Sequence, residues 1–99
     1  MGGMKRQPSL TERWEVYFEG HVQGVGFRYT ARRIAARFAV AGYVKNLPDG
    51  RVLLVMEGGP DEMGRMLQAL QAEMGRYIVR TSRNIAPATG EFRGFEIRF

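Results

Sequence analysis

Apolar and polar side chains alternate over residues 14–19. Trp14, Val16 and Phe18 are apolar, and glutamate or tyrosine occupies the positions between and after them. Successive side chains of a strand point to opposite faces, so this alternation places one face toward a core and the other toward solvent. The pattern predicts a first strand with one buried face.

After residue 26 the apolar period becomes that of a helix. The apolar positions are Phe27, Ala31, Ile34, Ala35 and Phe38, and the outer face carries Arg32, Arg33 and Arg37. Such a stripe predicts an amphipathic helix whose arginines are solvated. Gly42 is well placed to end this helix.

Two strand-like runs, 43–47 and 52–57, flank Pro48-Asp49-Gly50. Proline presets the backbone of a turn and glycine accepts a positive φ. We therefore expect these two runs to form a hairpin.

A second amphipathic helix is predicted from Pro60 onward. Proline suits the first turn of a helix by geometry, and Asp61 and Glu62 suit it by charge. The apolar stripe of this helix consists of Met63, Met66, Leu67, Leu70 and Met74.

The rest of the chain predicts a strand over 77–83, a loop over 84–90 and a last strand in which Phe95, Ile97 and Phe99 alternate with charged residues. The order is βαββαβ plus one strand. Right-handed crossovers in this order place both helices on one face of a sheet. We expect an α+β, ferredoxin-like sandwich with a mixed or antiparallel sheet of four to five strands. This order alone fits many unrelated functions.

The composition fits one small domain. The chain has 99 residues, of which 44% are hydrophobic and 25% charged, and it has no cysteine. A cysteine nucleophile, thiolate metal ligands and disulfides are therefore excluded. Residues 1–13 contain no apolar run for a signal peptide or a membrane span, so we expect a flexible leader over 1–13, a single domain over 14–99 and a cytoplasmic protein without a membrane partner.

A formal charge of +5 favours anionic partners. The same positive field would serve a small phosphorylated substrate or a nucleic acid. Charge alone does not choose between these two classes.

A glycine-rich loop, residues 20–28, joins the first strand to the first helix. Gly24 and Gly26 allow a tight turn that brings backbone N–H groups close to a ligand, and the following helix directs its positive end the same way. Arg28 adds a planar cation that can bind two phosphate oxygens together. The loop therefore predicts a phosphate site. It is neither a dinucleotide fingerprint nor a P-loop, because the glycine spacing of the first and the Gly-Lys-Ser/Thr of the second are missing.

The amino-acid sequence of this loop resembles a signature of the acylphosphatase family. It reads Gly20-His21-Val22-Gln23-Gly24-Val25-Gly26-Phe27-Arg28. The run from Gly42 to Val52 resembles the second signature of that family, and the run from Gly90 to Ile97 resembles its terminal strand. The resemblance covers residues from about 14 to 99. It implies a ferredoxin-like enzyme that hydrolyses the carboxyl–phosphate bond of acyl phosphates to a carboxylate and inorganic phosphate.

The resemblance also implies the roles of individual residues. Arg28 and Asn46 match the two catalytic positions of the family. The backbone donors around the phosphate would be those of Gln23, Gly24, Val25, Gly26, Phe27 and Arg28. Asn46 would hold a water for in-line attack on phosphorus, which requires the strand that carries it to lie near the loop. We expect a monomer that uses no metal and no cofactor.

The chemistry of the leaving group agrees with so small a set of residues. A carboxylic acid has a pKa of about 4, so the carboxylate leaves without a proton from the enzyme. A phosphate ester would release a poor alkoxide, and the chain offers neither a cysteine nucleophile nor a carboxylate cluster for two metals. An ester phosphatase is therefore disfavoured.

Two alternatives stay open. One is a catalytically silent domain that binds an anion in the same pocket. The other is a ferredoxin-like RNA-binding module, because residues 24–29 faintly resemble an aromatic-rich RNA motif. That run enters a helix rather than a central strand, and 52–56 has no aromatic residue, so we expect no nucleic acid partner. His21, beside the loop, is expected to be a solvated residue without a catalytic role.

Overall fold

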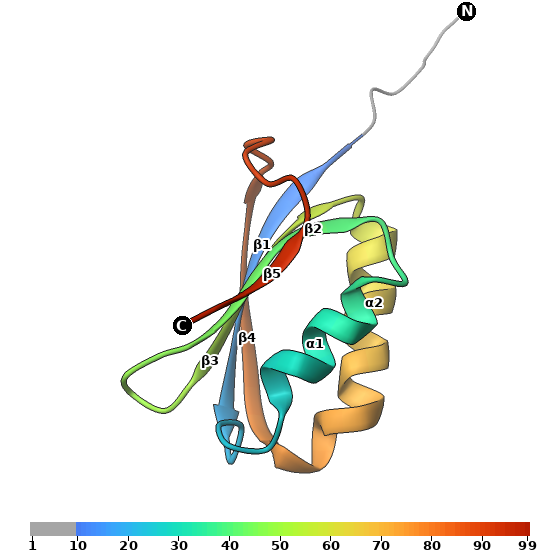
Figure 1. Cartoon of the computed structure of the whole chain (residues 1–99). Coiled ribbons are helices and arrows are strands. Elements are labelled where there is room, and N and C mark those ends of the chain that lie inside the picture. The colour runs from blue at the N-terminus through green and yellow to red at the C-terminus, as the bar shows by residue number, and fades with distance from the viewer. Residues whose placement is uncertain (1–9) are drawn as a thin grey trace, which may run out of the picture.

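Two helices lie side by side on one face of a five-stranded sheet in the computed structural model, which describes residues 10–99 (Figure 1). The strands are β1 (Glu12–Gly20), β2 (Val40–Asn46), β3 (Val52–Gly58), β4 (Ile78–Pro87) and β5 (Phe95–Arg98). The helices are α1 (Phe27–Ala35) and α2 (Pro60–Met74), and a 3-10 turn, η1 (Gly75–Tyr77), follows α2. The predicted ferredoxin-like α+β class is confirmed.

The core lies between the sheet and the helices. Trp14, Val16 and Phe18 are buried, as their alternation predicts. Facing them are the buried stripes of α1 (Phe27, Ala31, Ile34, Ala35) and α2 (Met63, Met66, Leu70, Met74). Because a helix as short as α1 is marginal in isolation, burial of this stripe is what holds it at the end of the glycine-rich loop.

Gly42 does not end the first helix, which is a correction to the sequence-based expectation. α1 ends at Ala35, where Arg37 and Phe38 donate N–H bonds three residues back and tighten the last turn. Gly42 lies within β2 with φ 151°, and a Cβ there would stand 1.9 Å from the Val55 carbonyl oxygen. Close approach of the β3 backbone, not helix termination, therefore requires this glycine.

The loop predicted over 84–90 is also partly wrong, because β4 continues to Pro87. Asn84 to Pro87 pair with the first residues of β1, from Glu15 back to Glu12. β1 itself begins at Glu12. The first nine residues of the expected leader lie outside the described residues, and no helix within 10–99 is long and apolar enough to cross a membrane.

The strand order is β4-β1-β3-β2-β5. β1 and β2 are each antiparallel to β3 and therefore parallel to one another, and β5 runs parallel to β2. Val52 pairs with both Phe18 and Asn46. Because parallel strands end at the same edge of a sheet, the loop after β1 and the end of β2 meet at one edge.

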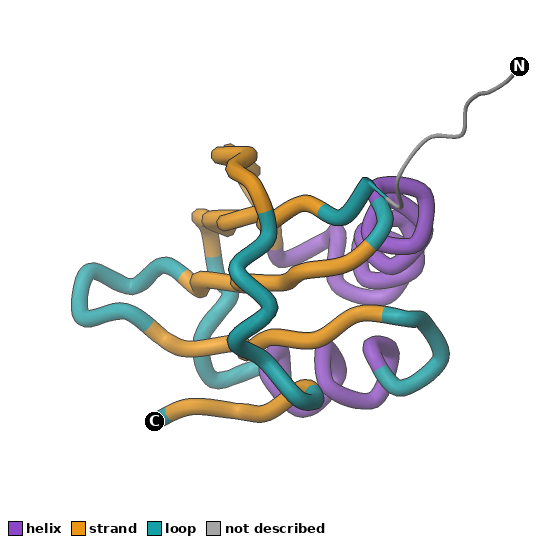
Figure 2. Tube along the Cα trace, turned by 90° about the horizontal axis from the view of Figure 1, so that it is seen from above, coloured by secondary structure: helices purple, strands orange, loops and turns teal. Residues whose placement is uncertain are grey.

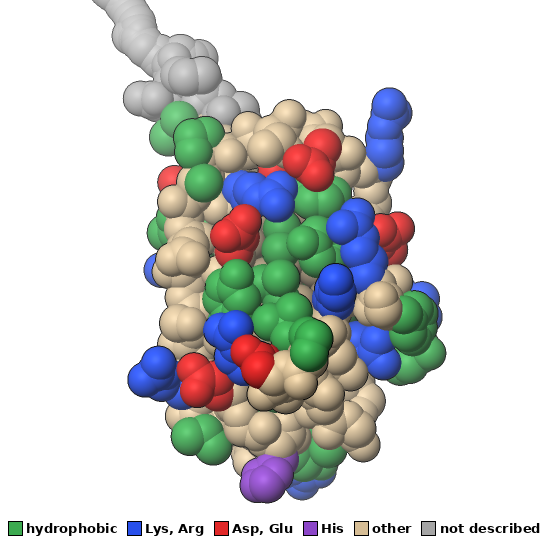
Figure 3. All heavy atoms as spheres, turned by 90° about the vertical axis from the view of Figure 1, so that its left-hand side faces the viewer, with side chains coloured by type: hydrophobic (Ala, Val, Ile, Leu, Met, Phe, Trp, Pro, Cys, Tyr) green, Lys and Arg blue, Asp and Glu red, His purple; other side chains and the backbone are tan. Residues whose placement is uncertain are grey.

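The face of the sheet opposite the helices is not covered by another element of residues 10–99 (Figure 2). Apolar side chains lie along its middle with charged side chains of both signs around them (Figure 3). Arg51 stacks on Tyr17, with 4.6 Å from the guanidinium carbon to the ring centre, and Arg98 stacks on Tyr43 at 3.9 Å. Such stacks shield the apolar middle of the face.

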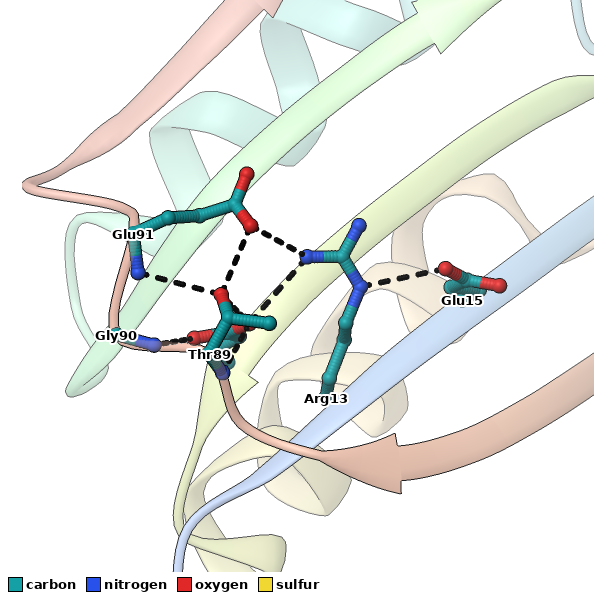
Figure 4. A network of polar contacts seen from close by, with 6 residues as sticks. Arg13, Glu15, Thr89, Gly90 and Glu91 are labelled. Atoms are coloured by element: carbon teal, nitrogen blue, oxygen red, sulfur yellow. Dashed lines mark hydrogen bonds and ion pairs between the residues drawn. The ribbon is translucent and has the colours of Figure 1, made fainter.

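A buried carboxylate anchors the loop between β4 and β5 (Figure 4). Glu57, at the end of β3, accepts hydrogen bonds from the Thr89 amide (2.9 Å), the Thr89 hydroxyl (2.7 Å) and the Gly90 amide (2.9 Å). Arg13 also donates to it, at 3.3 Å. Burial raises the pKa of the Glu57 carboxyl, but these donors outweigh burial and hold the pKa below its ordinary value. We call this cluster the Glu57 clamp.

Candidate functional site

One cavity of about 190 Å³ lies at the edge where β1 and β2 end. It is lined by Val22, Gly24, Gly26, Phe27, Arg28, Tyr29 and Asn46. The fold thus brings together both predicted catalytic residues and three other residues of the predicted phosphate site. Gln23 and Val25 do not line this cavity, and His21 does not either.

The two loop glycines adopt the left-handed backbone conformation. Gly24 and Gly26 both have φ 79°, and a Cβ on either would meet no atom within 4 Å. Backbone conformation rather than space therefore calls for glycine, because L side chains rarely adopt such a φ. Gly26 is also the residue that caps α1 at its N-terminus.

The N-terminus of α1 is arranged to receive an anion from outside the helix. Its cap makes no side-chain hydrogen bond, and its first turn carries no acidic residue. The first turn of α2, by comparison, carries Asp61 and Glu62. Because the first N–H groups of a helix have no partner within it, those of α1 can bind an oxyanion that the chain itself does not supply.

Arg28 lines the cavity and is held from β5. Its Nη1 donates to the Arg98 carbonyl oxygen at 3.2 Å, and its guanidinium carbon lies 4.7 Å from the centre of the Phe99 ring. A guanidinium has five N–H donors, so most remain for a ligand. Sequence reasoning missed these two supports, because they come from residues some 70 positions away.

Asn46 ends β2 and presents an unpaired acceptor. Its Oδ1 is buried and has no hydrogen-bond partner, and it is the only such side-chain atom within residues 10–99. No protein group donates to this acceptor, and it belongs to a residue on the wall of a cavity, so it can accept a hydrogen bond from a water or a ligand bound there.

Gln23 contacts the hairpin instead of the cavity. Its Nε2 donates to the Leu47 carbonyl at 2.8 Å and to the Arg51 carbonyl at 2.9 Å. The glycine-rich motif predicts a role for the Gln23 backbone and gives no indication of this side-chain contact. Val25 packs partly buried against the core. His21 is exposed, and its backbone N–H binds the Tyr77 carbonyl at 2.9 Å.

The lining of the cavity is positive. It contains Arg28 and no carboxylate. In the part of the chain that the structure describes, three or more His, Cys, Asp or Glu residues do not gather anywhere as potential metal ligands. The arrangement can bind a small oxyanion between backbone N–H groups and a guanidinium, beside one amide side chain.

The family model for acylphosphatase matches residues 14–97. The chain belongs to the acylphosphatase family. It is 38% identical over 85 residues to an acylphosphatase from Archaeoglobus fulgidus, an alignment that covers 86% of this chain and 96% of that protein. It is 41% identical over 98 residues to one from Synechococcus sp. (strain WH7803), covering 95% of each. The crystal structure of acylphosphatase from Bacillus subtilis has a TM-score of 0.80 at 27% identity, over 89% of this chain and 99% of that one.

These comparisons confirm the family that the loop and hairpin motifs indicate. Acylphosphatases are hydrolases, so the prediction of an enzyme of this class is confirmed as well. The sheet of the Bacillus subtilis protein and the ferredoxin-like arrangement described above correspond over nearly the whole domain.

Proposed function

We propose that this acylphosphatase binds the phosphoryl group of an acyl phosphate in the loop cavity and hydrolyses it in one step. The backbone amides of residues 23–28 and the Arg28 guanidinium bind the phosphoryl oxygens. A water on Asn46 attacks phosphorus in line with the leaving carboxylate. The water supplies the oxygen that forms the new P–O bond, the P–O bond to the acyl group breaks, and the carboxylate leaves with the electron pair. The protons of the water pass to the phosphate product and to solvent.

The unpaired Oδ1 of Asn46 is the observation that carries this proposal. It is buried, it belongs to a residue on the wall of the cavity, and that wall also contains Gly24, Gly26 and Arg28. An amide oxygen accepts a hydrogen bond from water, and acceptance of one hydrogen orients the lone pair of the water oxygen. The site therefore has a holder for the nucleophile next to a holder for the phosphate.

The chemistry requires little else from the protein. The leaving carboxylate needs no proton, because its conjugate acid has a pKa of about 4. What remains is stabilisation of negative charge on the phosphoryl oxygens, which fixed donors supply without reorganisation. The loop amides and Arg28 are such donors.

The test is hydrolysis of acetyl phosphate and benzoyl phosphate with EDTA present. We expect Arg28→Ala to remove measurable turnover and to weaken inhibition by inorganic phosphate. Asn46→Ala should lower kcat by about 100-fold or more with nearly unchanged inhibition by phosphate. Asn84→Ala, on exposed β4, is the matched control and should behave as wild type.

Near-normal turnover by Asn46→Ala would refute the water-holding role. Activity that disappears in EDTA and returns with a divalent ion would refute the metal-free mechanism. Phosphate binding without hydrolysis of any acyl phosphate would instead identify a silent anion-binding domain.

The paired charges on the open face of the sheet support the proposal that the substrate is a small molecule and not a nucleic acid. Four arginines have an acidic partner: Arg13 with Glu57, Arg51 with Asp49, Arg80 with Glu19 and Arg98 with Glu96. A nucleic-acid surface would instead present an unpaired positive stripe. The proposal includes a monomer in the cytoplasm, which sedimentation and fractionation would test.

A further inference from the structure

We infer that the side chain of Gln23 is a positioning residue that couples the glycine-rich loop to the end of β2. The inference rests on the proposed function and adds to it a part that the motif did not assign. The loop amide of Gln23 belongs to the proposed phosphate site, whereas its side chain points to the hairpin that follows Asn46. The contact of this side chain sets the distance between bound phosphate and attacking water.

We call the contact between Gln23 and the hairpin the Gln23 clamp. The Nε2 group of Gln23 has two hydrogens, and it uses both, on the carbonyl oxygens of Leu47 and Arg51. These two residues flank the Pro48-Asp49-Gly50 turn, and they also pair with each other, since the Leu47 amide donates to the Arg51 carbonyl at 2.8 Å. Leu47 directly follows Asn46, so the clamp acts one residue from the proposed water holder.

The sheet offers no direct alternative to this link. β3 lies between β1 and β2, so no ladder hydrogen bond joins the strand before the loop to the strand that carries Asn46. Between residues 20–28 and 46–51, the two hydrogen bonds of Gln23 are the only ones in the described structure. The spacing of the loop and Asn46 is set indirectly through β3, whose Val52 pairs with both Phe18 and Asn46, and the Gln23 side chain is the direct link between the two.

Both carbonyl oxygens that Gln23 contacts have a second hydrogen-bond partner within the hairpin. The Leu47 carbonyl also accepts the Gly50 amide at 3.1 Å, and the Arg51 carbonyl also accepts the Leu47 amide. Loss of the Gln23 donors would leave neither oxygen without a partner. A contact whose loss leaves no buried carbonyl unpaired, and which joins the two halves of a proposed active site, points to a role in catalysis.

Catalysis is sensitive to the quantity that the clamp would control. In-line attack needs water oxygen and phosphorus close together and aligned, and a misplacement of about 1 Å can cost roughly 100-fold in rate. Phosphate binding depends on the loop amides and Arg28 alone. Removal of the clamp should therefore lower kcat and leave phosphate affinity nearly unchanged.

The experiment compares Gln23→Met with Gln68→Met, the same change on an exposed position of α2. Methionine keeps the length of the side chain and removes both donors. We expect Gln23→Met to lower kcat by about 10- to 100-fold, with the inhibition constant of inorganic phosphate changed less than about threefold and Tm close to that of wild type. Gln68→Met should match wild type in all three.

A second variant, Gln23→Glu, adds a readout that a purely structural residue would not give. Its ionised carboxylate faces two carbonyl oxygens and cannot donate, whereas its protonated form regains one donor. The kcat of this variant, relative to wild type at each pH, should therefore rise as the pH falls. Unchanged kcat in both variants, or parallel losses of kcat, phosphate binding and Tm, would overturn the inference.

Phosphate titration by NMR separates this inference from the proposed function. In wild type, inorganic phosphate should shift the loop amides and the Asn46 side-chain amide together, and in Gln23→Met only the loop amides. If wild type shows that coupling but hydrolyses no acyl phosphate, the proposed function fails and the clamp stands. If hydrolysis is normal and Gln23→Met still shifts Asn46 as wild type does, the clamp fails and the function stands.

Discussion

The Glu57 clamp and the loop cavity are lined by the same kinds of hydrogen-bond donor, but only the first surrounds a carboxylate of the chain. In the clamp, two consecutive backbone amides, a hydroxyl and an arginine surround a carboxylate that belongs to the chain. In the cavity, the N-terminus of α1 and Arg28 face a space without any acidic side chain of the chain. The first site has a resident anion, and the second lacks one of its own.

The difference shows how the molecule separates stability from function. Both oxygens of the Glu57 carboxylate accept hydrogen bonds, so the Glu57 clamp fixes the loop after β4 without leaving a buried acceptor unpaired. The cavity leaves Asn46 Oδ1 unpaired and its donors available. Satisfied buried polar groups make a part of the fold rigid, whereas an acceptor that no protein donor satisfies is open to a water or a ligand.

The largest expected effect distinguishes Arg28, in the cavity, from Arg13, in the Glu57 clamp. Arg28→Lys should lower kcat/KM by about 100-fold, because a lysine replaces a planar fork with a point charge, and should leave urea unfolding unchanged. Arg13→Lys should do the reverse, with a loss of about 1 kcal/mol in the free energy of unfolding and near-normal kinetics. Equal effects of both variants on both measurements would show that the two sites are not independent.

A smaller effect concerns acid and the Glu57 clamp. The donors around Glu57 hold its folded-state pKa below the ordinary value of about 4.3. Its contribution to the free energy of unfolding is therefore complete above about pH 4.3 and is lost as the pH falls through the folded-state pKa. The difference in unfolding free energy between wild type and Glu57→Gln should shrink across that range. A difference that stays constant from pH 6 to pH 3 would contradict this account.

The smallest expected effect is at the support of Arg28. Phe99→Ala removes the ring beneath the guanidinium, and a stack of this kind at an exposed site is worth about 0.5–1 kcal/mol. We expect the inhibition constant of inorganic phosphate to rise about two- to fivefold at unchanged Tm. Val79→Ala, which trims another exposed apolar side chain, is the control. An effect of Val79→Ala as large as that of Phe99→Ala would show that Phe99 has no specific role in supporting Arg28.

Local pattern predicted most of the elements because each depends on neighbours in sequence. The alternation at Trp14, Val16 and Phe18 gave the buried face of β1, and the stripe from Met63 to Met74 gave that of α2. The start of α2 at Pro60 was also correct, since proline and acidic residues act within one turn. The motif that contains Gly24, Gly26 and Arg28 located the cavity before the fold was known.

Predictions failed where a distant strand decided the outcome. Gly42 was expected to end a helix, and the nearby backbone of β3 requires it instead. β4 is longer than its own pattern indicates, because the start of β1 pairs with it. The residues around Gly42 and those at the end of β4 do not by themselves indicate these contacts.

The amino-acid sequence by itself determined the order of elements, the buried face of each, the family and the loop conformation that glycine permits, since these follow from periodicity, side-chain volume and φ. Only the tertiary structure decided that Gln23 reaches the hairpin, that Arg98 and Phe99 support Arg28, and that Asn46 Oδ1 stays unpaired on the cavity wall. The reason is physical: the contacts of Gln23 and Arg28 join residues that lie 24 to 71 positions apart in the chain, and strand order and register bring these residues together.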